Sequence, residues 1–470
     1  MRTCSRISGF VRLAGIAMAA ARIALVERTA AKAGLATVAG LPAFAALVFL
    51  PATSVSAQTR PDTLSLGALQ SAALAHDPRD AQFELLSRID SLRQRTENAE
   101  LLPQFGLSAK AQYQSDVISL PFSPGSGTAP DQPHDSYDAY LGITQSILDP
   151  SRSARREVRR AENIEATSRV HTSLHSLRGA VNEAYFAALS AQLRQREMEA
   201  AARALEVQLA LASDRVRLGA ALPSEAAMLE AELLARRQAA DALGSARAAA
   251  LRVLEQLSGT TLDSSTVLVL PNLAQLVASV RPNLQALRER PEYSQFDGSR
   301  ALLQARESVA SARTRPRVLG FGRTGYGRPA LNPLATEFDA YWLAGIQVEW
   351  SPWNWGTAKR ERAQLKVQEL ILASEEAAFT ESLVRAASTE LAEMDRLART
   401  VSADERIISL RESVLSETRI RFEEGVVTPA DYVSRDSELL VARLTRASHE
   451  VELASVQARF LTTAGLEVPR

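Results

Sequence analysis

The sequence feature that most constrains the fold is a stretch without glycine or proline, residues 357–424. With no helix breaker, this stretch can form one α-helix about 100 Å long at roughly 1.5 Å per residue. Apolar residues recur along it at every seventh position: Ala387, Met394, Val401, Ile408, Leu415 and Phe422. This spacing predicts the seam of a left-handed coiled coil. Such a long helix therefore needs partners along its whole length.

The residues that follow predict a turn and a returning helix. Gly425 suits the end of the first helix, and Thr428 and Pro429 suit the cap and first position of the next one. Asp431 then faces the positive end of that helix. Because the helical pattern continues to about Ala464, we predict one long helical hairpin.

The same hairpin occurs twice in the chain. Residues 215–225 align without gaps on residues 421–431, 206 positions later. The alignment pairs the glycine and the proline of the two turns: Gly219 with Gly425, and Pro223 with Pro429. Each turn glycine is followed 40 residues later by another glycine, Gly259 or Gly465. We conclude that one structural unit is duplicated.

The duplication and the N-terminal composition together predict the domain organisation. We expect a leader at 1–57, a first repeat at 58–258 with a hairpin at about 152–258, a connector at 259–282, and a second repeat at 283–466 with a hairpin at about 357–464.

The N-terminal residues predict a secretory leader. Basic residues precede an apolar run at 41–50, and Val-Ser-Ala at 55–57 offers a cleavage site. Its removal leaves 48 basic and 53 acidic residues, and this mild acidity argues against a nucleic-acid partner. The single cysteine, Cys4, excludes a disulfide framework. No apolar run of about 18 residues follows, so no membrane-spanning helix is predicted.

Strands are predicted where the helical periodicity gives way to short extended segments: at about 104–117, 137–147, 317–327 and 338–351. In three of them apolar and aromatic residues alternate with small and polar ones, and the segment 317–327 is rich in glycine. This is the pattern of a transmembrane β-barrel. Four tryptophans fit an aromatic girdle: Trp342, Trp350, Trp353 and Trp355. The alternative is a soluble sheet with one solvated face.

Four strands cannot close a barrel by themselves, because the smallest such barrels have eight. The chain must therefore assemble with copies of itself. A dimer would give eight strands and a trimer twelve, and only the trimer leaves much of a lumen.

The order of the elements resembles the TolC family of outer-membrane efflux proteins. Helix, strand, strand and long hairpin follow one another twice between about residues 62 and 466. The most similar residues are 352–356 (Pro-Trp-Asn-Trp-Gly) and 421–425 (Arg-Phe-Glu-Glu-Gly), followed by Asp431. The resemblance implies a mainly α fold with a transmembrane β part. It implies a homotrimer, whose twelve-stranded β-barrel in the outer membrane continues into a twelve-helix α-barrel across the periplasm.

The function implied by this resemblance is a passive exit channel of a tripartite efflux system, located in outer-membrane lipid. A periplasmic adaptor protein would dock at the turns of Gly219, Pro223, Gly425 and Pro429, and an inner-membrane pump would deliver the cargo. A duct for type I protein secretion or for metal efflux has the same architecture, so the patterns leave the cargo open. A periplasmic coiled-coil adaptor is a further alternative, but it has one hairpin and no such strand pairs.

The resemblance also indicates a gate at the start of the return helices. By position, Asp431 matches the gate aspartate of the family, and Glu225 matches its counterpart in the first repeat. Three copies would form a ring of six carboxylates, which favours cations and raises some carboxyl pKa values by mutual repulsion. Ser434 and Val427 replace a second gate acid and an arginine of the best-known member, so the closed state would be locked differently. Alternatively, both acids only stabilise their helix ends.

No catalytic, metal or cofactor site is predicted. His171 and His175 lie four positions apart on a helix but lack a third ligand, and we interpret them as packed or solvated. The arginine pairs at 155–156, 159–160 and 236–237 are interpreted as solvated helix faces. No set of nucleophile and base residues indicates an enzyme.

Overall fold

The computed structural model describes residues 63–117, 133–280, 288–333 and 335–469, and the predicted leader lies outside these ranges. The helices are α1 Leu66–His76, α2 Ala81–Ala99, α3 Ser151–Arg217, α4 Pro223–Ser258, α5 Ala274–Val280, α6 Pro291–Ala312, α7 Thr357–Glu423 and α8 Pro429–Ala464. The strands are β1 Thr63–Leu64, β2 Gln104–Tyr113, β3 Asp135–Leu148, β4 Val267–Leu268, β5 Arg317–Arg328 and β6 Asp339–Glu349.

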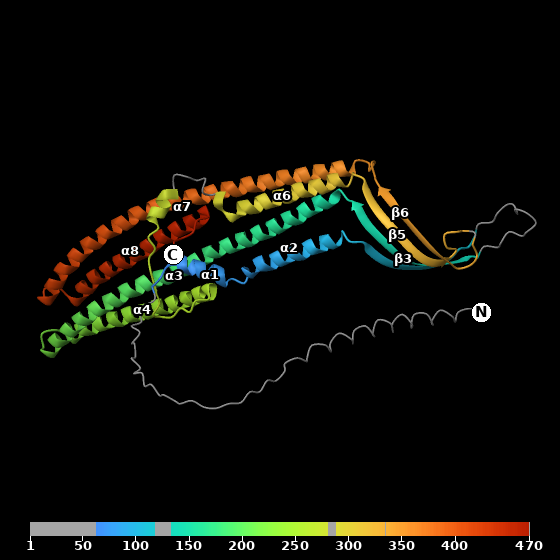
Figure 1. Cartoon of the computed structure of the whole chain (residues 1–470). Coiled ribbons are helices and arrows are strands. Elements are labelled where there is room, and N and C mark those ends of the chain that lie inside the picture. The colour runs from blue at the N-terminus through green and yellow to red at the C-terminus, as the bar shows by residue number, and fades with distance from the viewer. Residues whose placement is uncertain (1–62, 118–132, 281–287, 334, 470) are drawn as a thin grey trace, which may run out of the picture. The chain divides into compact units, whose positions relative to one another are not determined.

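The two helical hairpins have equal lengths, as a duplication requires. Helices α3 and α7 have 67 residues each, and the return helices α4 and α8 have 36 each. Gly219 and Gly425 adopt φ values of 74° and 77° at the turns, a region that is costly for residues with a Cβ atom. Both turns lie at the same end of the structure (Figure 1).

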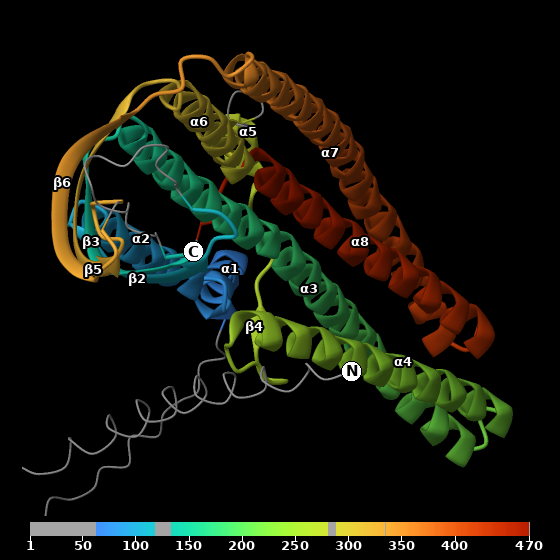
Figure 2. The same cartoon turned by 90° about the vertical axis from the view of Figure 1, so that its right-hand side faces the viewer.

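The helices form one layer, in which different helices take equivalent places in the half nearer the turns and in the half nearer the strands. In the half nearer the turns, α8 packs between α7 and α3, and α4 packs on the other side of α3 (Figure 2). In the half nearer the strands, α6 takes the place of α8 and α2 takes the place of α4. A return helix of 36 residues covers only about half of a 67-residue helix. The short helices α2 and α6 therefore cover the remaining half.

The largest hydrophobic core lies where these two halves meet. It is built from α1, α5 and the middle of the long helices, around the buried side chains of Tyr185 and Phe460. The parallel pair β1–β4 borders it. The side-chain amide of Gln192 donates to the Leu268 carbonyl (2.8 Å) and accepts from its N–H (3.0 Å), which satisfies buried backbone groups of β4.

The other strands form one antiparallel sheet in the order β2-β3-β5-β6. All four extend from the same end of the helices (Figure 1). Strand β2 ends at Tyr113, four residues before the predicted end at residue 117. At residues 116–117 the Asp116 carboxylate accepts from the Val117 N–H (3.0 Å) in a local turn. Among the described residues β2 and β6 are edge strands, so the sheet of a single chain is open. No helix within the described ranges combines the length and hydropathy needed to cross a bilayer.

Candidate functional site

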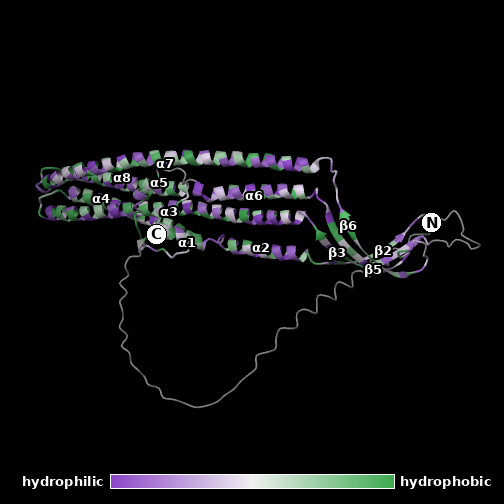
Figure 3. Ribbon diagram, turned by 45° about the horizontal axis from the view of Figure 1, so that its top comes forward, coloured by the Kyte–Doolittle hydropathy of each residue, from purple (hydrophilic) through white to green (hydrophobic). Residues whose placement is uncertain are grey.

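One face of the sheet exposes apolar side chains. Leu107 and Leu141 are opposite each other on β2 and β3, and Trp342 and Ile346 lie on the same face of β6. Leu107 is 82% exposed and Trp342 75%. In Figure 3 the arrowheads of β3 and β6 carry the green colour of hydrophobic residues. Because exposed apolar area costs about 25 cal/mol per Å² in water, this face needs an apolar environment.

The opposite face of the sheet is polar. The Arg323 guanidinium lies over the rings of Tyr140 (5.3 Å) and Tyr341 (5.6 Å). The Tyr341 hydroxyl donates to the Asp138 carboxylate at 2.5 Å. Gly325 makes room for this cluster, because a Cβ atom there would lie 2.7 Å from the Cβ atom of Tyr140. Glycine in this strand is thus explained by close side-chain packing.

The predicted tryptophans lie towards the two ends of β6. Trp342 is near its start, and Trp350, Trp353 and Trp355 follow its end. Eight residues separate Trp342 from Trp350, which corresponds to about 26 Å at roughly 3.3 Å per residue. All four side chains are exposed, and the Trp350 indole N–H donates to the Thr314 carbonyl at 3.0 Å.

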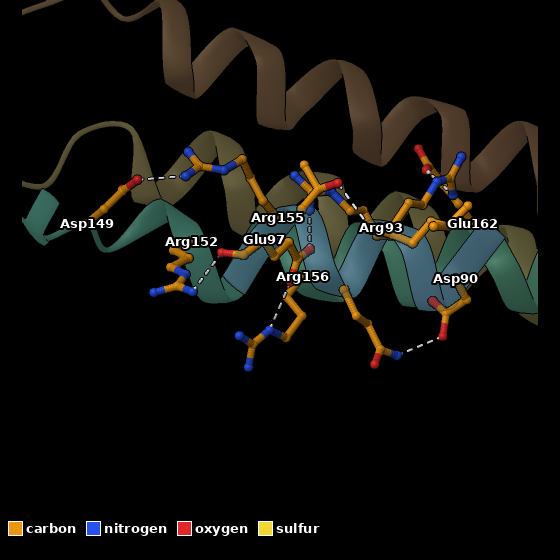
Figure 4. Close-up of polar contacts among 12 residues, drawn as sticks. Asp90, Arg93, Glu97, Asp149, Arg152, Arg155, Arg156 and Glu162 are labelled. Atoms are coloured by element: carbon orange, nitrogen blue, oxygen red, sulfur yellow. Dashed lines mark hydrogen bonds and ion pairs between the residues drawn. The ribbon is translucent and has the colours of Figure 1, made fainter. Parts of the chain in front are cut away.

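Arginines tie α2 to α3 where the helices meet the strands (Figure 4). Glu97 at the end of α2 is buried and forms ion pairs with Arg156 (3.2 Å) and Arg159. Arg152 donates to the Glu97 carbonyl at 3.1 Å, and Arg155 pairs with Asp149 at 2.7 Å. Interpreting the arginine pairs of this region as solvated was therefore wrong for Arg159, which is partly buried, whereas Arg156 is exposed and ion-paired at the same time.

The turns of the two hairpins are in contact. The Arg215 guanidinium at the end of α3 donates to the carbonyls of Phe422 (3.1 Å) and Glu423 at the end of α7. It also lies over the Phe422 ring at 5.9 Å. Pro223 and Pro429 open the return helices beyond the turns. The predicted docking residues of both repeats thus lie at one end of the helix layer.

The two predicted gate acids have different surroundings. Asp431 forms a capping box: its carboxylate accepts from the Thr428 N–H (3.2 Å), and its own N–H donates to the Thr428 hydroxyl (3.2 Å). The same hydroxyl also donates to the Asp431 carboxylate (2.7 Å). The hydrogen bonds that the carboxylate accepts from the Thr428 hydroxyl and N–H lower the pKa of Asp431 below its ordinary value. Glu225 occupies the same position in α4, and no hydrogen bond of its side chain occurs among the described residues. Asp431 therefore stabilises its own helix end in the single chain.

A buried ion pair between α4 and α8 was not predicted. Arg236 is 3% exposed and pairs with Asp436, which is 8% exposed, and with Glu232 at 2.9 Å. The interpretation of Arg236 as a solvated residue was wrong. The sequence does contain a signal, because Arg236 continues the buried stripe of Leu229 and Leu233 at spacings of four and three.

The two histidines are packed differently. His175 is buried, and its Nε2 hydrogen-bonds the Thr462 carbonyl at 3.0 Å. His171 is exposed and lies against the Phe83 ring at 4.6 Å. Within the described residues no group of three potential ligands is placed to hold a metal ion.

The fold is that of solved outer-membrane channels, as the resemblance to the TolC family predicts. CusC, from structures that concern transmembrane channel formation, is similar with a TM-score of 0.65 and 15% identity over 85% of this chain and 92% of that chain. The outer membrane protein VceC of Vibrio cholerae has a TM-score of 0.61 and 14% identity over 85% of this chain and 96% of that chain. The open MtrE outer membrane channel of Neisseria gonorrhoeae has a TM-score of 0.61 and 18% identity over 86% and 90%. No family model and no curated protein sequence matches the chain.

Proposed function

We propose that this chain is the outer-membrane channel of a tripartite efflux system and acts as a passive duct, not as an enzyme. The observation that carries the proposal is an open sheet with an exposed apolar face, joined to two equal hairpins in the fold of outer-membrane channels. A periplasmic adaptor protein and an inner-membrane pump would be its partners.

The open edges of the sheet support assembly as a homotrimer. Strand β6 of one copy would pair with β2 of the next, which satisfies the backbone groups of both edges. Three copies then give a twelve-stranded barrel, wide enough for a lumen. The helix layer supports the same number, because four helices lie side by side in both of its halves. Three copies would therefore continue the barrel as a ring of twelve helices.

The tryptophans support an orientation across the membrane. Because strands of such barrels tilt by about 35–45°, the roughly 26 Å along the strand between Trp342 and Trp350 spans about 20 Å of membrane, which is most of an apolar band about 25 Å tall with an aromatic girdle at each interface. The apolar face of the sheet would then contact lipid, and the face of Arg323 would line the lumen. The helices would extend into the periplasm.

The turns support adaptor docking. Leu218 and Val426 are exposed at the turns, at 78% and 70%, and a docked adaptor would remove this apolar area from water. In the trimer Glu225 and Asp431 would lie near the constriction and act as its gate. Removing the Asp431 carboxylate then has two consequences, loss of a gate charge and loss of its half of the capping box.

The decisive experiment is single-channel recording of the purified protein in planar bilayers. We expect stable conductance from a species that migrates as a trimer when unheated and as a monomer after boiling. A monodisperse single-chain species in detergent-free buffer, with no conductance, would contradict the proposal. Co-purification of an adaptor and its pump would then identify the pump class.

A further inference from the structure

Three basic residues lie in the segments next to the tryptophans at the helix end of β6. Arg315 is in the turn between α6 and β5, and Lys359 and Arg360 begin α7. The hydrogen bond from the Trp350 indole to the Thr314 carbonyl joins the turn of Arg315 to the segment between β6 and α7. The Arg360 guanidinium donates to the Trp355 carbonyl at 2.8 Å. We call Arg315, Lys359 and Arg360 the basic junction patch.

The charges of this patch are not compensated within the described chain. Neighbouring acids are already used, because Glu361 pairs with Arg313 at 3.1 Å and Glu349 pairs with Arg317. Arg315 and Lys359 form no ion pair with any residue that the structure describes. The partner of Arg360 is an uncharged carbonyl. Three positive charges therefore face solvent, since all three side chains are exposed.

Helix stability does not account for these residues. Lys359 and Arg360 lie at the positive end of the α7 dipole, where cations are unfavourable. The first turn of α7 has no acidic residue, and its cap residue, Gly356, has no side chain that could accept a hydrogen bond. At the other end of the hairpin, α8 begins with the capping box of Asp431. The patch also extends beyond the helix end, because Arg315 belongs to a different turn.

The position of the patch indicates its partner. It directly follows the exposed apolar face, whose last members on β6 are Ile346, Val348 and the adjoining Trp350. Indoles and cationic side chains next to an apolar surface are typical of the headgroup layer of a membrane. We propose that the basic junction patch binds the phosphate groups of anionic phospholipids in the leaflet that faces the helices. This inference rests on the proposed placement of the sheet in the outer membrane.

The tryptophans provide the probe for a test. The chain has four, and Trp342→Phe leaves only the three beside the patch. The trimer of this variant is reconstituted in phosphatidylcholine with brominated phosphatidylglycerol or brominated phosphatidylcholine, and quenching of fluorescence gives their relative association constant. We expect phosphatidylglycerol to bind at least about fivefold better, the effect of one basic residue near an anionic surface.

Two triple variants in the Trp342→Phe background identify the residues responsible. Both remove three exposed positive charges: Arg315→Gln, Lys359→Gln and Arg360→Gln in the patch, and Arg203→Gln, Arg252→Gln and Arg399→Gln on the helices as the control. The patch variant should lose the lipid preference, whereas the control should keep it. High salt should weaken the preference in the parent.

Three results would overturn the inference: equal quenching by both lipids in the parent, an unchanged preference in the patch variant, or full competition by millimolar inorganic phosphate, which would indicate an ion site. Conductance is measured with the same preparations. A conducting trimer without lipid preference refutes the patch alone, whereas absence of quenching by either lipid refutes the membrane placement and the proposed function with it.

Discussion

Replacing Asp436 by alanine should loosen the contact between the two hairpins near their turns. The substitution leaves the Arg236 guanidinium buried with Glu232 (2.9 Å), the Ser437 hydroxyl (3.1 Å) and the Ala201 carbonyl (3.4 Å) as remaining partners. Removing one partner of a buried ion pair costs about 3–5 kcal/mol. Since Glu232 still neutralises part of the charge, we expect about 3 kcal/mol, which is roughly a hundredfold change in the equilibrium for local opening.

Hydrogen exchange measured by mass spectrometry can test this value. Amides of α4 and α8 near Arg236 and Asp436 should exchange about a hundredfold faster in the variant, whereas amides around Leu254 and Phe460 in the main core should not change. Glu206→Ala is the matched control, because it breaks an exposed ion pair with the adjacent Arg237, and such pairs contribute only about 0–1 kcal/mol.

A double variant separates the charge effect from simple loss of contact. Arg236→Leu combined with Asp436→Leu removes both charges and restores apolar packing, so protection should recover in large part. The reasoning is refuted if Asp436→Ala leaves exchange unchanged, or if the double variant exchanges as fast as the single one.

Three further outcomes are expected. Asp431→Ala should lower the cation selectivity of the channel in planar bilayers if the ring of carboxylates forms a gate; unchanged selectivity and conductance would leave only the capping role. Burial lowers the pKa of His175, with help from nearby arginine charges, so the unfolded state binds more protons as pH falls below the ordinary histidine pKa of about 6.5. Thermal stability should therefore drop between pH 7.5 and about 5.5, and His175→Gln should reduce this drop while His171→Gln does not. Gly425→Ala should destabilise the turn by about 1–2 kcal/mol, because φ is 77° there and no atom near a new Cβ atom provides another cause; an unchanged melting temperature would contradict this.

The sequence alone determined the long elements of this protein. Helix α7 is long because its segment lacks glycine and proline and repeats apolar residues every seventh position. Helix α3 contains one glycine, Gly179, and no proline, and it reaches the same length. The turns follow from local chemistry, with a glycine at positive φ and a proline opening the return helix. Strands β2, β3 and β6 follow from alternation over about ten residues, and the glycine-rich segment gives β5. All these rules act between residues close in the chain.

Only the tertiary structure decided which charges are paired. It buried Arg236 against Asp436, 200 residues away, and placed Glu97 among arginines more than fifty residues later. It also showed that Asp431 caps its own helix. The position of Arg236 on an apolar stripe indicates that its helix face is covered, but it does not indicate which residue covers it. The burial of a charged residue depends on how the hairpins pack, and distant segments decide that packing through contacts that no local pattern records.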